Sequence, residues 1–179
     1  DWSSDVCSSD LNAGVMQRCA GICGRFPVNR IPDKDMQRRL SETVMDCYNA
    51  GFKHIVTGMS GQFEQMAVRI VSELKTKMPD MTLTVVMTPC ECSGYARYLS
   101  GKGSDRDLWE YVETADNLKP VRQDSRLTDY TQKNRYIVDR SSRLICCYRP
   151  ELIREAETCH LISLAERKPG LRIVNLYKP

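Results

Sequence analysis

The residues best suited to binding chemistry lie in the stretch His54-Ile-Val-Thr-Gly58-Met-Ser60-Gly61-Gln-Phe-Glu64. The stretch has the pattern of a short apolar strand, a turn of small residues and the first turn of a helix. Glycine lets backbone N–H groups approach a phosphate or ribose closely, and a helix N-terminus attracts anions. Glu64 adds a carboxylate that can accept hydrogen bonds from sugar hydroxyls. The pattern predicts a ligand site, although many α/β domains use the same elements only to turn the chain.

A second polar segment, Lys133-Asn134-Arg-Tyr-Ile-Val-Asp139-Arg140, lies late in the chain. Asn134 and Asp139 are candidate ligand contacts on a predicted helix, and the alternative is that they are surface or capping groups. Arg25 is a candidate phosphate contact if other donors converge on it, and is otherwise a solvated loop arginine. Neither histidine of the chain has a serine or cysteine placed to form a nucleophile pair with it. We therefore predict no catalytic residue.

Apolar periodicity predicts strands that alternate with helices along the chain. The predicted strands are Gln17–Cys23, Lys53–Thr57, Leu83–Met87, Asn117–Val121, Leu144–Tyr148 and Leu171–Leu176. The predicted helices are Asp33–Ala50, Gln62–Lys77, Leu108–Ala115, Tyr130–Asp139 and Ile153–Glu166. Leu83–Met87 and Leu144–Tyr148 are apolar enough to be inner strands covered on both faces. The predicted fold class is α/β, with a mostly parallel central sheet and helices on both faces.

The length of 179 residues and the apolar content of 41% suit one domain, which we place at residues 12–179. The segment Asp1–Leu11 has no basic or apolar signal-peptide region and resembles a translated adapter remnant, so we expect a non-native, unpacked tail. No stretch approaches the roughly 20 apolar residues of a membrane helix. We therefore expect a soluble, cytoplasmic protein with no membrane partner.

The nine cysteines form no pair of C-x-x-C units, and the adjacent Cys146 and Cys147 point to opposite faces of a strand. We expect free, mostly buried thiols in a reducing compartment and no metal site. The net charge is +3, and the basic residues are spread widely along the chain, which favours a solvated surface. Because no basic stretch is interleaved with aromatic residues, we expect no nucleic-acid partner.

The order of the motifs resembles the YpsA-like branch of the SLOG superfamily. That group of Rossmann-like domains also includes the DprA DNA-processing proteins and the Lonely Guy phosphoribohydrolases. The resemblance rests on Gly58-Met-Ser60-Gly61-x-x-Glu64 early in the chain and on Lys-Asn134-Arg-Tyr-x-Val-Asp-x-Ser-x-x-Leu-Ile late in it. It runs from about Arg18 to Tyr177 and implies a divergent member with a single Rossmann-like domain.

The resemblance implies that three loops bind a nucleotide or a nucleotide-derived ligand. Transferred residue by residue, the ligand-binding positions are Gly24, Gly58, Ser60, Glu64, Asn134, Asp139 and Thr158. Gly61 lies one residue before the family's second glycine, and Arg25 is added as a candidate. The family's Asp-Gly and Gly-Gly-Thr are replaced here by Arg149-Pro150 and Ala156-Glu157-Thr158. Since Glu157 would repel a phosphate, we expect an altered phosphate site.

The expected function is therefore a cytoplasmic module that binds or senses a nucleotide or its derivative and requires no cofactor. One alternative is N-glycosidic hydrolysis of a nucleoside monophosphate, with Glu64 or Glu157 as the carboxylate, although the Pro-Gly-Gly-x-Gly-Thr-x-x-Glu string of the Lonely Guy proteins is absent. A second alternative, binding of single-stranded nucleic acid, rests on fold analogy alone. A protein partner and a homo-oligomer are both left open.

Overall fold

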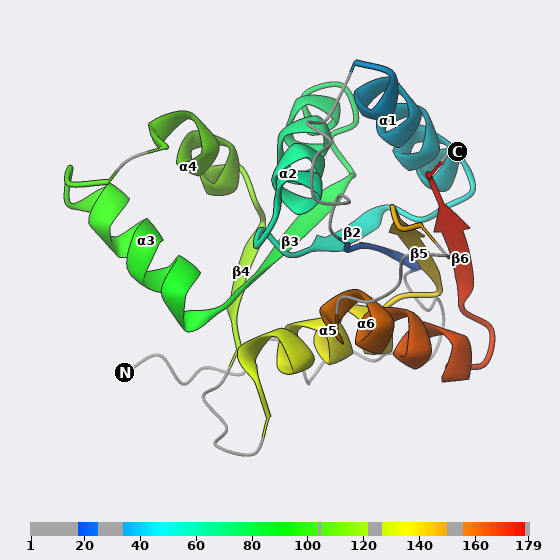
Figure 1. The fold of residues 1–179 in the computed structure, drawn as a ribbon. Coiled ribbons are helices and arrows are strands. Elements are labelled where there is room, and N and C mark those ends of the chain that lie inside the picture. The colour runs from blue at the N-terminus through cyan, green and yellow to red at the C-terminus, as the bar shows by residue number, and fades with distance from the viewer. Residues whose placement is uncertain (1–17, 25–33, 104, 122–126, 150–155, 178–179) are drawn as a thin grey trace, which may run out of the picture.

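The computed structural model describes residues 18–24, 34–103, 105–121, 127–149 and 156–177, with only the backbone described for Ala156 and Glu157. Within these residues six parallel strands form one sheet in the order β4-β3-β2-β1-β5-β6 (Figure 1). The strands are β1 Cys19–Ile22, β2 His54–Thr57, β3 Thr82–Met87, β4 Asn117–Pro120, β5 Arg143–Cys146 and β6 Arg172–Asn175. The prediction of a parallel sheet with Leu83–Met87 and Leu144–Tyr148 in inner strands is confirmed, since β3 and β5 each have two neighbours.

The helices are α1 Lys34–Asn49, α2 Gln62–Lys75, α3 Pro89–Leu99, α4 Arg106–Glu113, α5 Asp129–Arg140 and α6 Ala156–Arg167. Helices α1 and α2 lie on one face of the sheet, and α5 and α6 lie on the other (Figure 1). Successive side chains of a strand point to opposite faces. Accordingly, Leu144 packs in the core on the α5–α6 side, whereas its neighbour Ile145 packs in the core on the α1–α2 side.

The connections leave β1 in opposite directions across the sheet. From β1 the chain proceeds outward through β2 and β3 to β4, and then returns to place β5 on the other side of β1. In open parallel sheets, a crevice forms at the carboxyl ends of the two strands where the direction reverses, and ligands bind there. The topology therefore places the candidate site at the carboxyl ends of β1 and β5.

Helix α3 was missed by the sequence prediction. None of its residues is fully buried, although Cys92, Tyr95 and Tyr98 pack partly buried against the core, so its apolar pattern is weak. The available signal was at its N-terminus, where Pro89 is the first helical residue and the Thr88 N–H donates to Glu91 Oε2 at 2.7 Å. Aromatic contacts hold α3 against α4, with the Tyr95 and Trp109 ring centroids 5.6 Å apart.

Other sequence predictions differ from the structure only at the ends of elements, or lie outside the described residues. The strand predicted at Gln17–Cys23 is observed over Cys19–Ile22, and the helix predicted at Gln62–Lys77 is observed over Gln62–Lys75. The segment Asp1–Leu11 lies outside the described residues, so its role as a non-native tail stays a prediction. Among the described helices, none combines the length and apolarity needed to span a membrane.

Candidate functional site

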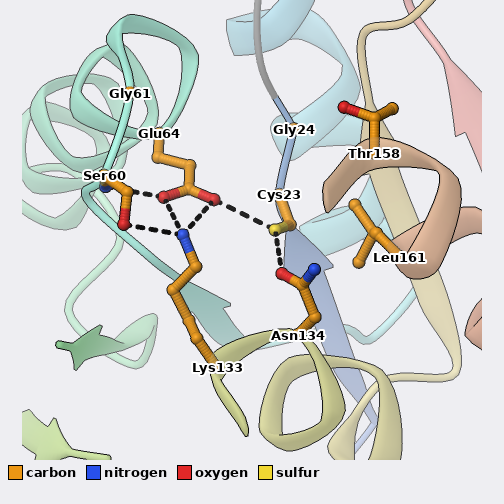
Figure 2. Close-up of a pocket in the computed structure, with 9 residues that line it drawn as sticks. All are labelled: Cys23, Gly24, Ser60, Gly61, Glu64, Lys133, Asn134, Thr158 and Leu161. Atoms are coloured by element: carbon orange, nitrogen blue, oxygen red, sulfur yellow. Dashed lines mark hydrogen bonds and ion pairs between the residues drawn. The ribbon is translucent and has the colours of Figure 1, made fainter. Parts of the chain in front are cut away.

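A small pocket of about 30 Å³ lies at the carboxyl ends of β1 and β2, next to the crevice between β1 and β5. Figure 2 shows side chains from α2, α5 and α6 and from the residues that follow β1 and β2 facing one another around it. The residues that line the pocket are Cys23, Gly24, Ser60, Gly61, Glu64, Lys133, Asn134, Thr158 and Leu161. The fold thus gathers residues that lie far apart in the sequence.

The centre of the site is a buried ion pair between Glu64 at the start of α2 and Lys133 on α5 (Figure 2). The Lys133 ammonium lies 3.1 Å from Glu64 Oε1 and 2.9 Å from Oε2. The two side chains are only 4% and 3% exposed. Burial lowers the pKa of Lys133, but Glu64, Cys23 and Glu91 together raise it by more, so the net shift of the pKa is upward. Lys133 therefore stays charged at neutral pH.

Ser60 extends the ion pair into a network that reaches α3. Its backbone N–H donates to Glu64 Oε2 at 2.8 Å, and its hydroxyl oxygen accepts from Lys133 Nζ at 2.8 Å. The same hydroxyl donates to Glu91 Oε1 at 2.7 Å. Since Glu91 also accepts from the Thr88 N–H, the network ties the turn after β2 to the first turn of α3.

The Cys23 thiol lies between Glu64 and Asn134 at the end of β1. Its Sγ is 3.0 Å from Glu64 Oε1 and 3.5 Å from Asn134 Oδ1, so the single S–H donates to one oxygen or the other. Burial, together with the nearby Glu64 carboxylate, raises the pKa of Cys23 well above its usual value. Because the thiolate is the nucleophilic form, Cys23 acts here as a hydrogen-bond donor and not as a nucleophile.

Gly58 lies directly behind the ion pair, and its lack of a side chain is required there. A Cβ atom at this position would lie 2.4 Å from Glu64 Oε2 and 2.9 Å from Lys133 Cδ. Gly24 meets a different constraint, since its φ of +147° lies in a region that side chains disfavour. Both predicted glycines therefore shape the site through the backbone.

The structure brings most of the predicted site residues together. Those that line the pocket are Gly24, Ser60, Gly61, Glu64, Asn134 and Thr158, and Gly58 lies behind it. Asp139 does not join them, because it is exposed near the far end of α5 and its backbone carbonyl accepts a hydrogen bond from Lys168. Arg25 and the side chain of Glu157 lie outside the described residues. Ligand binding by these residues stays a prediction.

The sequence prediction missed three polar residues of the site network, namely Lys133, Cys23 and Glu91. A signal for Lys133 was present, since it lies four residues before the apolar Ile137 and so shares its inward helix face. Cys23 was placed at the end of a strand, in a loop expected to reach the site, but not among the ligand-binding residues. Glu91 belongs to the helix that the sequence prediction missed.

The residues that the structure describes suggest no metal centre and only limited enclosed space. They include no group of three or more His, Cys, Asp or Glu side chains that could hold a metal ion. The eight described cysteines are free thiols, and only Cys90 is exposed. The pocket volume of about 30 Å³ suits one small chemical group, whereas sites that enclose a whole ligand have about 300–1,000 Å³. A larger ligand would therefore place one part in the pocket.

A comparison with protein families identifies the family of this chain. Residues 30–168, well over half of the chain, match the YpsA family model, described as the YspA SLOG family. No curated protein matches the chain. The matched range includes the pocket residues on α2, α5 and α6, but begins after Cys23 and Gly24.

Proposed function

Since this chain belongs to the YspA SLOG family, we propose that its pocket binds a nucleotide or a nucleotide-derived ligand and that the protein acts as a binding or sensing module. Membership of the family supports a nucleotide-related binding module. The observation that carries the proposal is the convergence of Gly24, Ser60, Asn134 and Thr158 on the carboxyl ends of β1 and β2. This is the edge at which sheets of this topology bind ligands.

The chemistry of the pocket lining also suits a nucleoside. Gly24 and Gly61 allow a ligand to approach the backbone closely, while Asn134 and Thr158 provide an amide and a hydroxyl. Leu161 adds an apolar wall against which a base or the carbon face of a ribose can pack.

The hydrogen bonds of Glu64 favour binding over hydrolysis. A carboxylate has about four acceptor positions. The Ser60 N–H and two contacts from Lys133 occupy three of those of Glu64, and the Cys23 S–H is shared between the fourth and Asn134 Oδ1. A general acid or base must instead reach the substrate directly or through one water. We therefore propose a binding role in place of nucleoside-monophosphate hydrolysis, and free thiols support a cytoplasmic location.

A ligand screen tests this proposal. The purified chain is examined by thermal shift and calorimetry against nucleosides, nucleoside mono- and diphosphates and cyclic nucleotides. We expect at least one class to stabilise the protein, and the variant Asn134→Leu to weaken its binding about tenfold or more by removing a buried amide. Asp139→Asn on the same helix is the matched control and should bind normally. Failure of every class to bind would refute the proposal, and release of a free base would favour the hydrolase.

A further inference from the structure

Two of the donors that a phosphate could use in this site are already used by the protein itself. Phosphates are bound by backbone N–H groups at the start of a helix and by lysine or arginine side chains. In this site, the Ser60 N–H just before α2 donates to the Glu64 carboxylate at 2.8 Å. The three protons of the Lys133 ammonium are directed at Ser60 Oγ and at both oxygens of Glu64. Glu64 thus stands where an external anion would bind.

The charge balance of the network also disfavours the binding of a phosphate. Two carboxylates, Glu64 and Glu91, face one ammonium, Lys133, which contacts Glu64 directly and shares the Ser60 hydroxyl with Glu91. Lys133 is the only cationic side chain among the described residues that line the pocket. An added phosphate would therefore meet a surplus of negative charge in a poorly solvated place.

We infer that the pocket receives the uncharged part of the ligand, so that it selects nucleosides over their 5′-phosphates. This inference rests on the proposed function and specifies its ligand class. The remaining lining groups fit it, because the Asn134 amide and the Thr158 hydroxyl pair with neutral donors and acceptors such as ribose hydroxyls. Lys133 is a potential phosphate-binding cation that Glu64 masks.

Gly58 shows that the masking carboxylate is held in place by the fold. Because a side chain at Gly58 would collide with Glu64 Oε2 and with Lys133 Cδ, the backbone leaves space for this pair to lie against it. The buried position of the pair, at 3% and 4% exposure, also costs desolvation energy that a purely structural contact at the surface would avoid.

The first experiment compares each of the common nucleosides with its 5′-monophosphate by calorimetry on the unmodified protein. We expect the best-binding nucleoside to bind at least about tenfold more tightly than its monophosphate, since one buried unfavourable charge contact is worth that much. Equal or tighter binding of the monophosphate would overturn the inference and leave the proposed function standing. If neither nucleosides nor monophosphates bind, the inference fails, and the proposed function then depends on the remaining classes of the ligand screen.

The second experiment removes the mask with Glu64→Gln and titrates inorganic pyrophosphate. We expect the variant to bind pyrophosphate at least about tenfold more tightly than the unmodified chain, because Lys133 then lacks its charged partner. The double variant Glu64→Gln with Lys133→Met should show no gain in pyrophosphate affinity. Glu110→Gln, which removes an exposed carboxylate on α4, is the control for the change in net charge.

A folded Glu64→Gln variant with no gain in pyrophosphate affinity would overturn the inference, as would an equal gain in Glu110→Gln. Folding is checked by circular dichroism and melting. If Glu64→Gln does not fold, Glu91→Gln takes its place, since it removes the other carboxylate while an amide can still contact Ser60 and the Thr88 N–H. A smaller gain of about threefold is then expected, and no gain would overturn the inference.

Discussion

Two lysine–carboxylate pairs occupy opposite edges of the sheet and differ chiefly in burial. Lys133 and Glu64 lie at the carboxyl edge and are 4% and 3% exposed. Lys53 and Asp80 lie just before β2 and β3, at the amino edge, and are each 48% exposed. In water an ion pair is weak because solvent screens it, whereas a buried charge depends on its partner. The exposed ion pair can therefore be lost at little cost in stability, whereas each charge of the buried pair requires its partner.

The difference also separates the edge that holds the candidate site from a supporting one. At the amino edge, Lys168 donates to the carbonyl oxygens of Val138, Asp139 and Ser141 at 2.7, 2.6 and 2.7 Å, which satisfies the C-terminus of α5. At the carboxyl edge, charged groups are instead drawn into the interior around a pocket. Proteins accept such a cost where a site must be held in a fixed geometry.

The largest expected effect comes from breaking the buried pair. Lys133→Met leaves Glu64 without its cation, so we expect the free energy of unfolding to fall by about 3–5 kcal/mol. Urea denaturation followed by circular dichroism measures this. A loss below about 1 kcal/mol would mean that the pair behaves like a surface pair and that the comparison between the edges is wrong.

A second substitution tests whether the residue behind the ion pair must be a glycine. Gly58→Ala places a Cβ 2.4 Å from Glu64 Oε2, and the overpacking should cost about 1–3 kcal/mol. The measurement is again denaturant unfolding, now combined with Lys133→Met in a double-mutant cycle. Because both changes act on Glu64, their effects should be less than additive, and strict additivity would contradict a shared cause.

Buried thiols at both edges should make the folded protein less stable at alkaline pH. Burial raises the pKa of Cys19, at the start of β1, and of Cys146, at the end of β5, from 9.0 to about 12. The folded chain then holds protons that the unfolded chain releases above pH 9. The contribution of these two thiols to the stability should therefore be constant below that pH and be lost as the pH rises toward 12.

Each thiol should contribute about 1 kcal/mol to the loss between about pH 9 and about pH 10. Denaturant midpoints measured across this range for Cys19→Ala and Cys146→Ala should each show a shallower decline than the unmodified chain. The exposed Cys90→Ala is the control and should decline normally. An unchanged slope in both buried variants would refute the assignment.

The smallest effect is expected at the exposed pair. Lys53→Met should leave the denaturation midpoint almost unchanged, because solvent replaces the lost contact with Asp80. Measured beside Lys133→Met under the same conditions, it provides the reference for the comparison. A loss as large as that of Lys133→Met would show that burial does not set the difference.

The order of elements was predictable from the sequence because parallel strands and their helices carry strong apolar patterns. The buried runs of β3 and β5 and the amphipathic face of α2 identified their elements directly. Helix α3 has a weaker pattern, since none of its side chains is fully buried and only part of its surface packs against the core. Its N-terminal Thr88-Pro89-x-Glu91 signal was the clearest local evidence for it.

The site was predictable in part. Gly58, Gly61 and Glu64 belong to one local motif, and the inward position of Lys133 could be inferred from Ile137. The pairing of Lys133 with Glu64 depends on α5 meeting the start of α2, which no local pattern describes. Asp139 was wrongly grouped with Asn134, because five helical residues turn the chain by about 140° beyond a full turn and separate the two faces. That separation follows from helical geometry and was available from the sequence.

The hydrogen bond between Ser60 and Glu91 links hydrogen exchange in α3 to the state of the pocket. Helix α3 has no buried side chain, so its amide protons should exchange with solvent through local opening long before the core unfolds. A ligand that tightens the turn at Ser60 would slow exchange in the first turn of α3, and one that pulls Ser60 away would hasten it. The rate of deuterium uptake in α3 thus registers what happens in a pocket that α3 does not line.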